Sequence, residues 1–156
     1  MKEKVAHLVV RVPKAGQQLA AIIAQHQDVI TKCGFVWFGV QGARMAPARA
    51  SLLIGQIKRK TSTYLYVVQR REEGFAAFRA KITAISETLP ESDLNHVPRY
   101  YVAELLLQGA RGWYRVEHFE DVDEEVLNSL SLYVNEKSVV RSLKKGMSSI
   151  MMVSEP

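Results

Sequence analysis

The segment Phe75–Ile85 alternates so regularly between core-type and surface-type positions that it predicts one long β-strand. The residues that share one face of this strand are Ala76, Phe78, Ala80, Ile82 and Ala84. Just upstream, Thr63–Gln69 is rich in tyrosine and valine, and Arg70–Gly74 has the polar and glycine content of a hairpin turn. The two strands therefore predict a hairpin whose apolar face other elements must cover.

The remaining segments predict strands at both ends of the chain and helices near its beginning. Val5–Val12 has the period of a strand and ends at Pro13, and Ile150–Val153 predicts a closing strand. Apolar residues recur at helical spacing in Gly16–Cys33, before the stop signal Gly34. The other predicted elements are a strand at Phe35–Gly39, a helix at Pro47–Lys60, a second hairpin made of Tyr100–Leu107 and Trp113–Glu120, a helical turn opened by Asp121–Glu125, and a short helix from Ser138 to Lys145.

Five or six short strands with two early helices predict an α+β fold, either a small mixed β-barrel or a strongly curved sheet, with helices packed at its ends. The 156 residues, of which 47% are hydrophobic, suffice for one compact domain over residues 1–156. No apolar run approaches the roughly 20 residues that cross a bilayer, so we expect a soluble, cytoplasmic protein that does not bind membranes.

Two residue types limit the chemistry that we expect. Cys33 is the single cysteine, which excludes an internal disulfide, and its place on the apolar face of the first helix predicts a buried, unreactive thiol. The four histidines are widely spaced, so the sequence predicts no metal site. We also expect no organic cofactor.

The charge is divided unequally along the chain. Residues 1–81 contain fourteen Lys and Arg against four Asp and Glu, whereas residues 82–156 contain seven against twelve, which gives formal charges of +10 and −5. If the basic residues share one face, that face suits a polyanion; otherwise the charges form a mixed, solvated surface.

Arginines and aromatic rings alternate in two nearby segments. Arg99 precedes Tyr100 and Tyr101, and Arg111 and Arg115 flank Trp113 and Tyr114. Aromatic rings stack on bases and arginines bind phosphates, so this pattern predicts nucleic-acid binding. The candidate phosphate-binding residues are Lys58, Arg59, Lys60, Arg99, Arg111 and Arg115.

The order of elements resembles the PUA-like superfamily, and within it the EVE, ASCH and YTH group of modified-base and RNA-binding modules. The resemblance extends from about residue 5 to residue 153. It is carried by Phe35–Gly39 before a helix, the glycine-led strand Gly74–Ala80, the pair Tyr100-Tyr101, the segment Trp113–Val116 and the late segment Met147–Ile150. The chain lacks the compact tryptophan pair of the most specific methyl-base readers.

The resemblance implies a PUA-type barrel whose aromatic pocket accepts a flipped base, including a modified one. The residues that match the pocket are Trp37, Phe38, Tyr100, Trp113 and Tyr114. Its implied partner is DNA or RNA, and EVE-type relatives imply a role in bacterial defence beside a separate nuclease or effector protein. We therefore expect a binding module that is not an enzyme.

Two other functions fit the same sequence. The first is a small ASCH-type hydrolase of modified nucleosides, in which Lys81, Glu104 or Glu117 would meet a polar ligand. The second is a protein-interaction module, in which exposed rings anchor a partner. Turnover of acylated nucleosides separates the first from simple binding.

Overall fold

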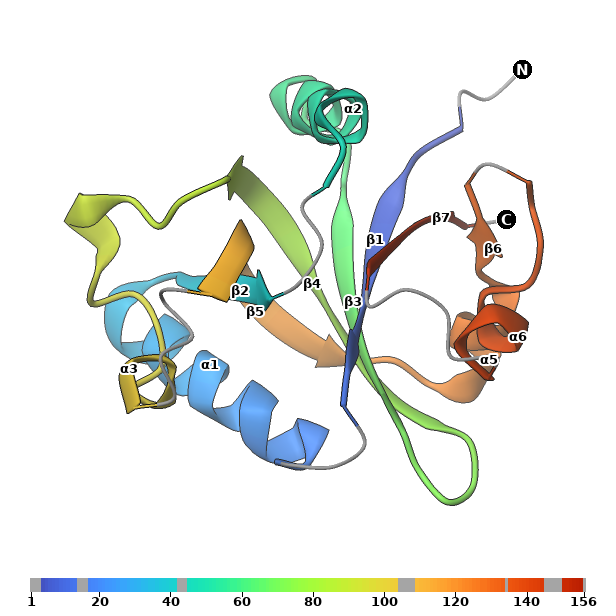
Figure 1. Ribbon diagram of the computed structural model, residues 1–156, viewed down its shortest axis with the longest axis horizontal. Coiled ribbons are helices and arrows are strands. Elements are labelled where there is room, and N and C mark those ends of the chain that lie inside the picture. Colours follow the sequence, from blue (N-terminus) through green and yellow to red (C-terminus); the bar gives the residue numbers. More distant parts are fainter. Residues whose placement is uncertain are drawn as a thin grey trace.

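The computed structural model describes residues 4–13, 17–41, 45–103, 109–133, 135–144 and 150–155 (Figure 1). These residues form one seven-stranded mixed sheet with helices on both faces. The elements are β1 (His7–Val12), α1 (Leu19–Cys33), β2 (Val36–Gln41), α2 (Pro47–Lys58), β3 (Tyr64–Arg70), β4 (Phe75–Ser86), the 3₁₀-helix η1 (Glu91–Asp93), α3 (Tyr100–Ala103), β5 (Ala110–Asp121), α5 (Glu124–Ser129), β6 (Ser131–Leu132), α6 (Val139–Lys144) and β7 (Ile150–Ser154).

The strands are ordered β2-β5-β4-β3-β1-β7-β6. Strands β1 and β3 pair in parallel, and every other neighbouring pair is antiparallel. In the described residues β2 and β6 are the two edges and do not pair with each other, so the sheet is open where a closed barrel was one of the predicted forms. Its central strands are covered on both faces, which explains the uninterrupted apolar run Leu8–Val10.

One face of the sheet carries α1 and α2, and the other carries α5 and α6. The first core contains Leu19, Ile22, Ile23 and Ile30 of α1 and Leu53 of α2. The second core contains Leu127 of α5 and Val139 and Leu143 of α6. In β1 and β3, successive side chains alternate between these cores, as the strand period requires. Among the described helices, none is long and apolar enough to cross a bilayer.

A third cluster lies beside edge strand β2, under the segment that connects β4 to β5. It is built from Trp37, Val97, Tyr101 and Trp113. At this edge the outward N–H of Trp37 donates to the carbonyl oxygen of His96 (2.8 Å), and that of Gly39 donates to the hydroxyl of Tyr101 (3.1 Å). The connecting segment therefore satisfies two hydrogen-bond donors of β2.

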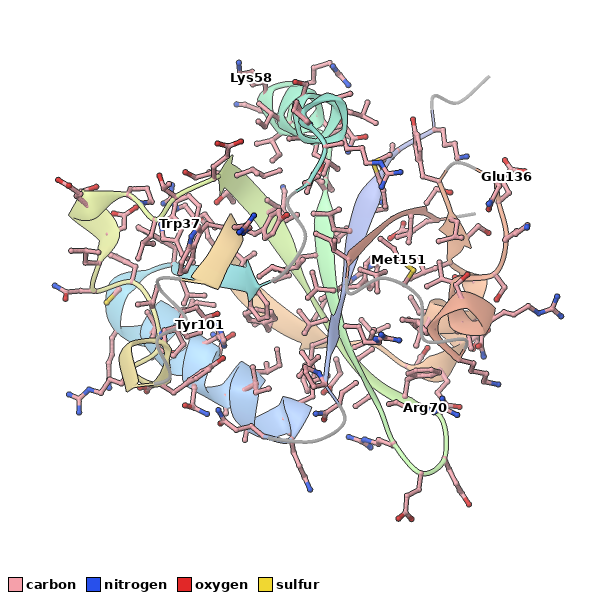
Figure 2. All side chains as sticks on the ribbon, viewed as in Figure 1. Trp37, Lys58, Arg70, Tyr101, Glu136 and Met151 are labelled. Atoms are coloured by element: carbon pink, nitrogen blue, oxygen red, sulfur yellow. The ribbon has the colours of Figure 1, made fainter. Side chains whose placement is uncertain are left out.

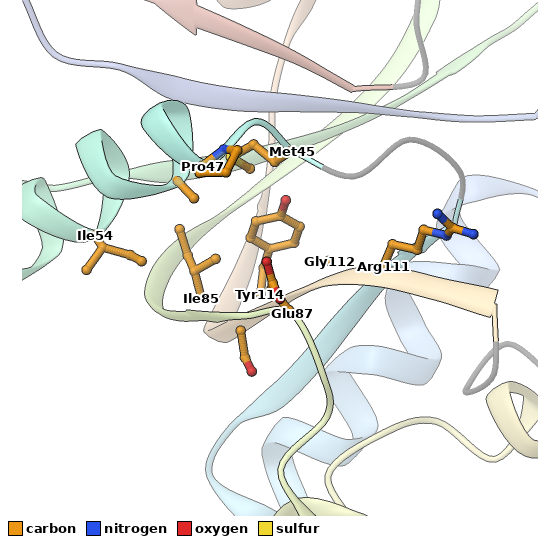
Figure 3. A pocket seen from close by; sticks show the side chains of 10 residues that line it. Met45, Pro47, Ile54, Ile85, Glu87, Arg111, Gly112 and Tyr114 are labelled. Carbon is orange, nitrogen blue, oxygen red and sulfur yellow. The ribbon is translucent and has the colours of Figure 1, made fainter.

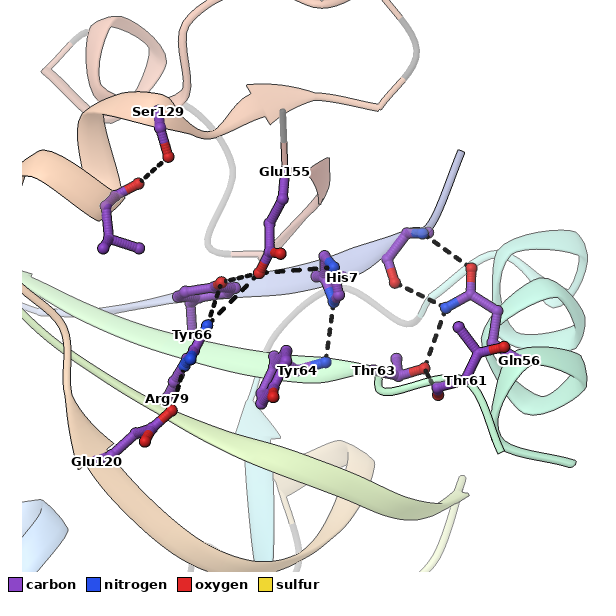
Figure 4. Close-up of polar contacts among 12 residues, drawn as sticks. His7, Gln56, Thr61, Thr63, Tyr64, Tyr66, Arg79, Glu120, Ser129 and Glu155 are labelled. Carbon is purple, nitrogen blue, oxygen red and sulfur yellow. Dashed lines mark hydrogen bonds and ion pairs between the residues drawn. The ribbon is translucent and has the colours of Figure 1, made fainter. Parts of the chain in front are cut away.

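The end of the chain is tied to the sheet by a polar cluster (Figure 4). The Tyr66 hydroxyl donates to the carboxylate of Glu155, and the Arg79 guanidinium lies 3.6 Å from the same carboxylate. Arg79 also pairs with Glu120, and the buried His7 lies 3.8 Å from Glu155. Burial lowers the pKa of His7, and its Nδ1 accepts the N–H of Tyr64 (3.0 Å), which places the proton of the neutral ring on Nε2.

Most predicted elements are confirmed, within a few residues at their ends. The first strand, both long helices, the β3–β4 hairpin and the closing strand all form. Gly34 ends α1 in the left-handed conformation, with φ of 92°. The hydroxyl of Ser138 accepts the N–H of Arg141 at the start of α6 (3.3 Å).

The second predicted hairpin is wrong. Tyr100–Ala103 is helical, residues 104–108 lie outside the described residues, and β5 pairs with β2 and β4 instead. Pro98 starts the turn, since its carbonyl oxygen accepts the N–H of Tyr101 (3.1 Å). The buried-thiol prediction is also wrong, because the last turn of α1 is exposed and Cys33 with it.

Candidate functional site

A cavity of about 210 Å³ lies between the N-terminal half of α2 and the adjoining ends of β4 and β5 (Figure 3). Its walls are mainly apolar and come from three separate parts of the chain. The lining residues are Met45, Pro47, Ala50 and Ile54 from α2 and its approach, Ile85, Ser86 and Glu87 from the end of β4, and Arg111, Gly112 and Tyr114 from β5. A volume this small suits a single ring system rather than a drug-sized molecule.

Helix α2 forms the roof of the cavity with one face and packs on the sheet with another. Pro47 occupies the first turn, where the missing N–H costs nothing. Ala50 and Ile54 are four residues apart and share the face that lines the cavity. The buried side chains of the helix, Leu53 and Gln56, belong to its C-terminal half.

Gln56 fixes that half of α2 to the first strand (Figure 4). Its side-chain oxygen accepts the N–H of Ala6, and its side-chain nitrogen donates to the carbonyl oxygen of Ala6, both at 2.8 Å. The same nitrogen donates to the Thr63 hydroxyl at 3.0 Å. A buried amide that is satisfied in this way holds the helix at a set distance from the sheet.

The floor of the cavity follows from the alternation of β5. Trp113 points into the third cluster, so Tyr114 points to the opposite face, where it is paired across strands with Ile85. Gly112 lies beside the Tyr114 ring, and a Cβ atom there would lie 3.1 Å from the Tyr114 hydroxyl. Glycine therefore leaves room for the hydroxyl at this end of the cavity.

Tyr114 brings a polar group, its hydroxyl, to an apolar wall of the cavity. The residue is only 1% exposed, and its hydroxyl has no hydrogen-bond partner among the described residues. Burial raises the pKa of Tyr114 well above its usual range, so the hydroxyl keeps its proton. It is free to donate one hydrogen bond to a ligand and to accept another.

Charged side chains stand at the mouth of the cavity. Glu87 and Arg111 both line it and both are exposed (Figure 3). Arg111 forms no ion pair within the described part of the chain. The arrangement places an apolar slot beside a cation and a carboxylate, which suits a planar ligand with polar edges and an anionic substituent.

Strand alternation separates the five predicted pocket residues. Tyr114 lines the cavity, whereas Trp37 and Trp113 are buried in the third cluster on the opposite face. Phe38 lies in the first core, with its ring 4.7 Å from that of His26. Tyr100 is half-buried and packs against the third cluster.

The six predicted phosphate-binding residues are dispersed around the molecule. Lys58, Arg59 and Lys60 are exposed at the C-terminal end of α2. Arg111 lies at the mouth of the cavity. Arg99 lines a separate, polar cavity of about 340 Å³ beside the C-terminal half of α1.

Arg115 lies on the face opposite the cavity and belongs to a stack of three side chains. Its guanidinium carbon is 3.8 Å from the centre of the Phe35 ring. That ring stacks on His96 with 4.0 Å between centres and 6° between planes. The Arg115 Nε is buried without a hydrogen-bond partner within the described residues.

Sequence reasoning missed the α2 side of the cavity and Glu87. Only a helix at Pro47–Lys60 was predicted there, and the spacing of Ala50 and Ile54 was the available signal of a shared face. The hydrolase residues do not meet there, because neither Lys81 nor Glu117 lines the cavity and Glu104 lies outside the described residues. Among the described residues, no group of three His, Cys, Asp or Glu side chains could hold a metal ion.

The chain is similar to a known protein family. A family model described as Pua-like matches residues 14–150, which is most of the chain. No curated protein and no solved structure matches the chain significantly. The matched range includes every residue that lines the cavity.

Proposed function

The chain belongs to the PUA-like family, and from this premise we propose that it binds nucleic acid and holds one flipped base in the cavity under α2. A base that leaves its stack needs apolar surfaces on both faces and a hydrogen-bond partner on its edge. The proposal assigns the first role to the walls from α2 and β4, and the second to Tyr114.

The observation that carries the proposal is the unpartnered hydroxyl of Tyr114. No described residue competes for this hydroxyl, and Tyr114 lines the cavity, so a ligand there can form a hydrogen bond with it. A base presents both donors and acceptors along its edge, so it satisfies the hydroxyl in either direction.

Charge at the mouth of the cavity supports the same ligand. Arg111 is exposed and forms no ion pair among the described residues, so it is available to the phosphate next to the flipped base. Glu87 lies on the other wall of the cavity.

The apolar lining favours a base that carries an added methyl group. A methyl group buried against Ile54 and Ile85 gains about 0.8 kcal/mol from its transfer out of water. A module of this kind acts through what it recruits, so the proposal includes a separate nuclease or effector protein as its partner.

The test is binding of labelled DNA and RNA oligonucleotides, unmodified and base-methylated, followed by fluorescence polarisation over a series of salt concentrations. We expect a preference for one modification that persists as salt rises, because base contacts depend on salt less than phosphate contacts do. The variant Tyr114→Phe should reduce that preference. The matched control is Tyr64→Phe, since Tyr64 lies on the other face of the sheet and its hydroxyl also has no partner among the described residues.

Equal binding of all bases by the wild-type protein and by Tyr114→Phe would overturn base recognition in this cavity. Turnover of an acylated nucleoside would favour the hydrolase. Absence of binding at every salt concentration would favour a protein-interaction module.

A further inference from the structure

A second group of basic side chains lies on the face of the sheet opposite the cavity. Strand β1, the β3–β4 hairpin and α6 supply it, and it centres on the C-terminal end of α6. We call it the α6 surface, and it consists of Arg11, Arg70, which Figure 2 labels, Arg141 and Lys144.

Two hydrogen bonds from neighbouring strands draw this surface together. Arg11 of β1 donates from Nη1 to the carbonyl oxygen of Leu143, and Arg70 of β3 donates from Nη1 to that of Lys144, both at 3.4 Å. Strands β1 and β3 are adjacent and parallel, so both arginines reach the same helix end. Arg141 lies one turn before Lys144 on α6, so these two side chains share a face of the helix.

The positive charge of the α6 surface exceeds what its surroundings neutralise. The C-terminal end of a helix carries about half a negative charge, far less than four cations. None of the four side chains pairs with a carboxylate among the described residues. The nearest acidic groups in sequence are Glu72 and Glu73 at the hairpin tip, and the Glu124 carboxylate lies against Gly74.

We propose that the α6 surface binds the phosphate backbone of a second segment of nucleic acid, while the first segment occupies the cavity on the opposite face. This inference rests on the proposed function. It adds a second contact on the other face of the sheet. The bound nucleic-acid strand must therefore pass round the domain, or a second nucleic-acid strand must bind there.

The shortage of exposed apolar side chains among the described residues favours nucleic acid over other anionic partners. The exposed large hydrophobic residues in the described part of the chain are Leu94 and Val126, and Val126 is only 36% exposed. Protein interfaces depend on buried aromatic or aliphatic anchors, and peripheral membrane binding depends on inserted ones. Backbone phosphates need only Arg and Lys.

The test compares two double variants that change the net charge equally. Arg141→Glu/Lys144→Glu reverses two exposed members of the α6 surface that form no side-chain hydrogen bond with the described residues. The control, Lys81→Glu/Lys137→Glu, reverses two exposed lysines that do not belong to it. Both are measured against the wild-type protein with a labelled oligonucleotide long enough to reach both faces, over a salt series, and with free nucleoside.

We expect the α6-surface variant to bind the long oligonucleotide at least about tenfold more weakly and to lower the salt slope by about two, because two phosphate contacts are lost. Its binding of free nucleoside should remain that of the wild-type protein, since the cavity is untouched. The control variant should stay within about threefold of wild type, through general charge alone.

Equal losses of affinity in both variants would overturn the inference, because the change in net charge alone would then explain them. Wild-type affinity in the α6-surface variant would overturn the inference too. If Tyr114→Phe still impaired binding in that case, the proposed function would hold without the second contact. A loss in the α6-surface variant beside an unaffected Tyr114→Phe would support the inference and remove the base pocket. Tighter binding to anionic lipid vesicles than to any oligonucleotide at equal salt would assign the surface to membranes and overturn it.

Discussion

The hydroxyl of Tyr101 lies 2.6 Å from Nε2 of His26, and both side chains are buried. The other ring nitrogen, Nδ1, lies 2.7 Å from the carbonyl oxygen of Ile22, which can only accept. The imidazole therefore carries its proton on Nδ1, and Tyr101 donates to Nε2. Through this bond α3 is fastened to the middle of α1.

His26 makes stability depend on pH. Burial lowers the pKa of His26 to about 4, compared with 6.5 when the ring is in water. As the pH is lowered from 6.5 to 4, the unfolded chain takes up a proton at this residue and the folded protein does not. The free energy of unfolding therefore falls by about 3 kcal/mol on acidification over that range. Urea denaturation at a series of pH values measures this fall.

His7, whose pKa is also lowered by burial, contributes in the same direction. The variant His26→Asn isolates the His26 part, because it keeps a polar side chain that does not titrate. An identical pH dependence in wild type and His26→Asn would show that His26 is not responsible.

Removal of the Tyr101 hydroxyl should destabilise the fold. Tyr101→Phe leaves Nε2 of His26 and the N–H of Gly39 without their partner, at a cost of about 1 to 3 kcal/mol. Tyr133→Phe, which removes a hydroxyl with no partner among the described residues, should have little effect. Thermal unfolding of the two variants distinguishes them. Equal melting temperatures would contradict a role of the Tyr101 hydroxyl in stabilising the fold.

Filling the cavity should abolish ligand binding without unfolding the protein. In Ala50→Phe the added ring projects from the face of α2 that lines the cavity. The matched control is Ala48→Phe, because Ala48 is exposed on the same helix and does not line the cavity. Both substitutions cost about 0.5 kcal/mol in helix propensity, so only a difference in binding is expected. Calorimetric titration with the preferred nucleoside measures it, and equal affinities would rule out the cavity as the site.

Two glycine substitutions should change stability in opposite directions. A Cβ at Gly39 would lie 2.8 Å from the ring of the buried Trp113, so Gly39→Ala should cost about 1 to 3 kcal/mol. A Cβ at Gly55 meets only the end of the Arg59 side chain, which can move away. Gly55→Ala should therefore stabilise α2 by up to about 1 kcal/mol. Chemical denaturation measures the free energy of unfolding of both variants. A stabilising Gly39→Ala would contradict the close approach of Gly39 to the Trp113 ring.

Local patterns were enough to predict the elements whose signals lie within one segment. The alternation of Phe75–Ile85 and the helical spacing before Gly34 both correspond to observed elements. The segment after Arg99 was predicted wrongly, because the position of Tyr101 depends on His26, which is 75 residues away in sequence. No local period contains that information.

The candidate site was predicted only in part, for a related reason. Tyr114 and Arg111 were singled out from their residue types, and they meet at the cavity. Trp113 was grouped with Tyr114 because they are neighbours in sequence, yet neighbours in a strand face opposite sides. The wall from Ala50 and Ile54 depends on how α2 crosses the sheet, which Gln56 fixes from a distance.

The covered edge of β2 has a consequence for how the protein behaves at high concentration. An uncovered edge strand can add a strand from another molecule and so begin aggregation. Here His96 and Tyr101 occupy the outward donors of Trp37 and Gly39, so this edge offers few main-chain partners for growth into a larger sheet. The segment that covers β2 thus also hinders self-association. Its loss would expose an aggregation-prone edge rather than a new binding surface.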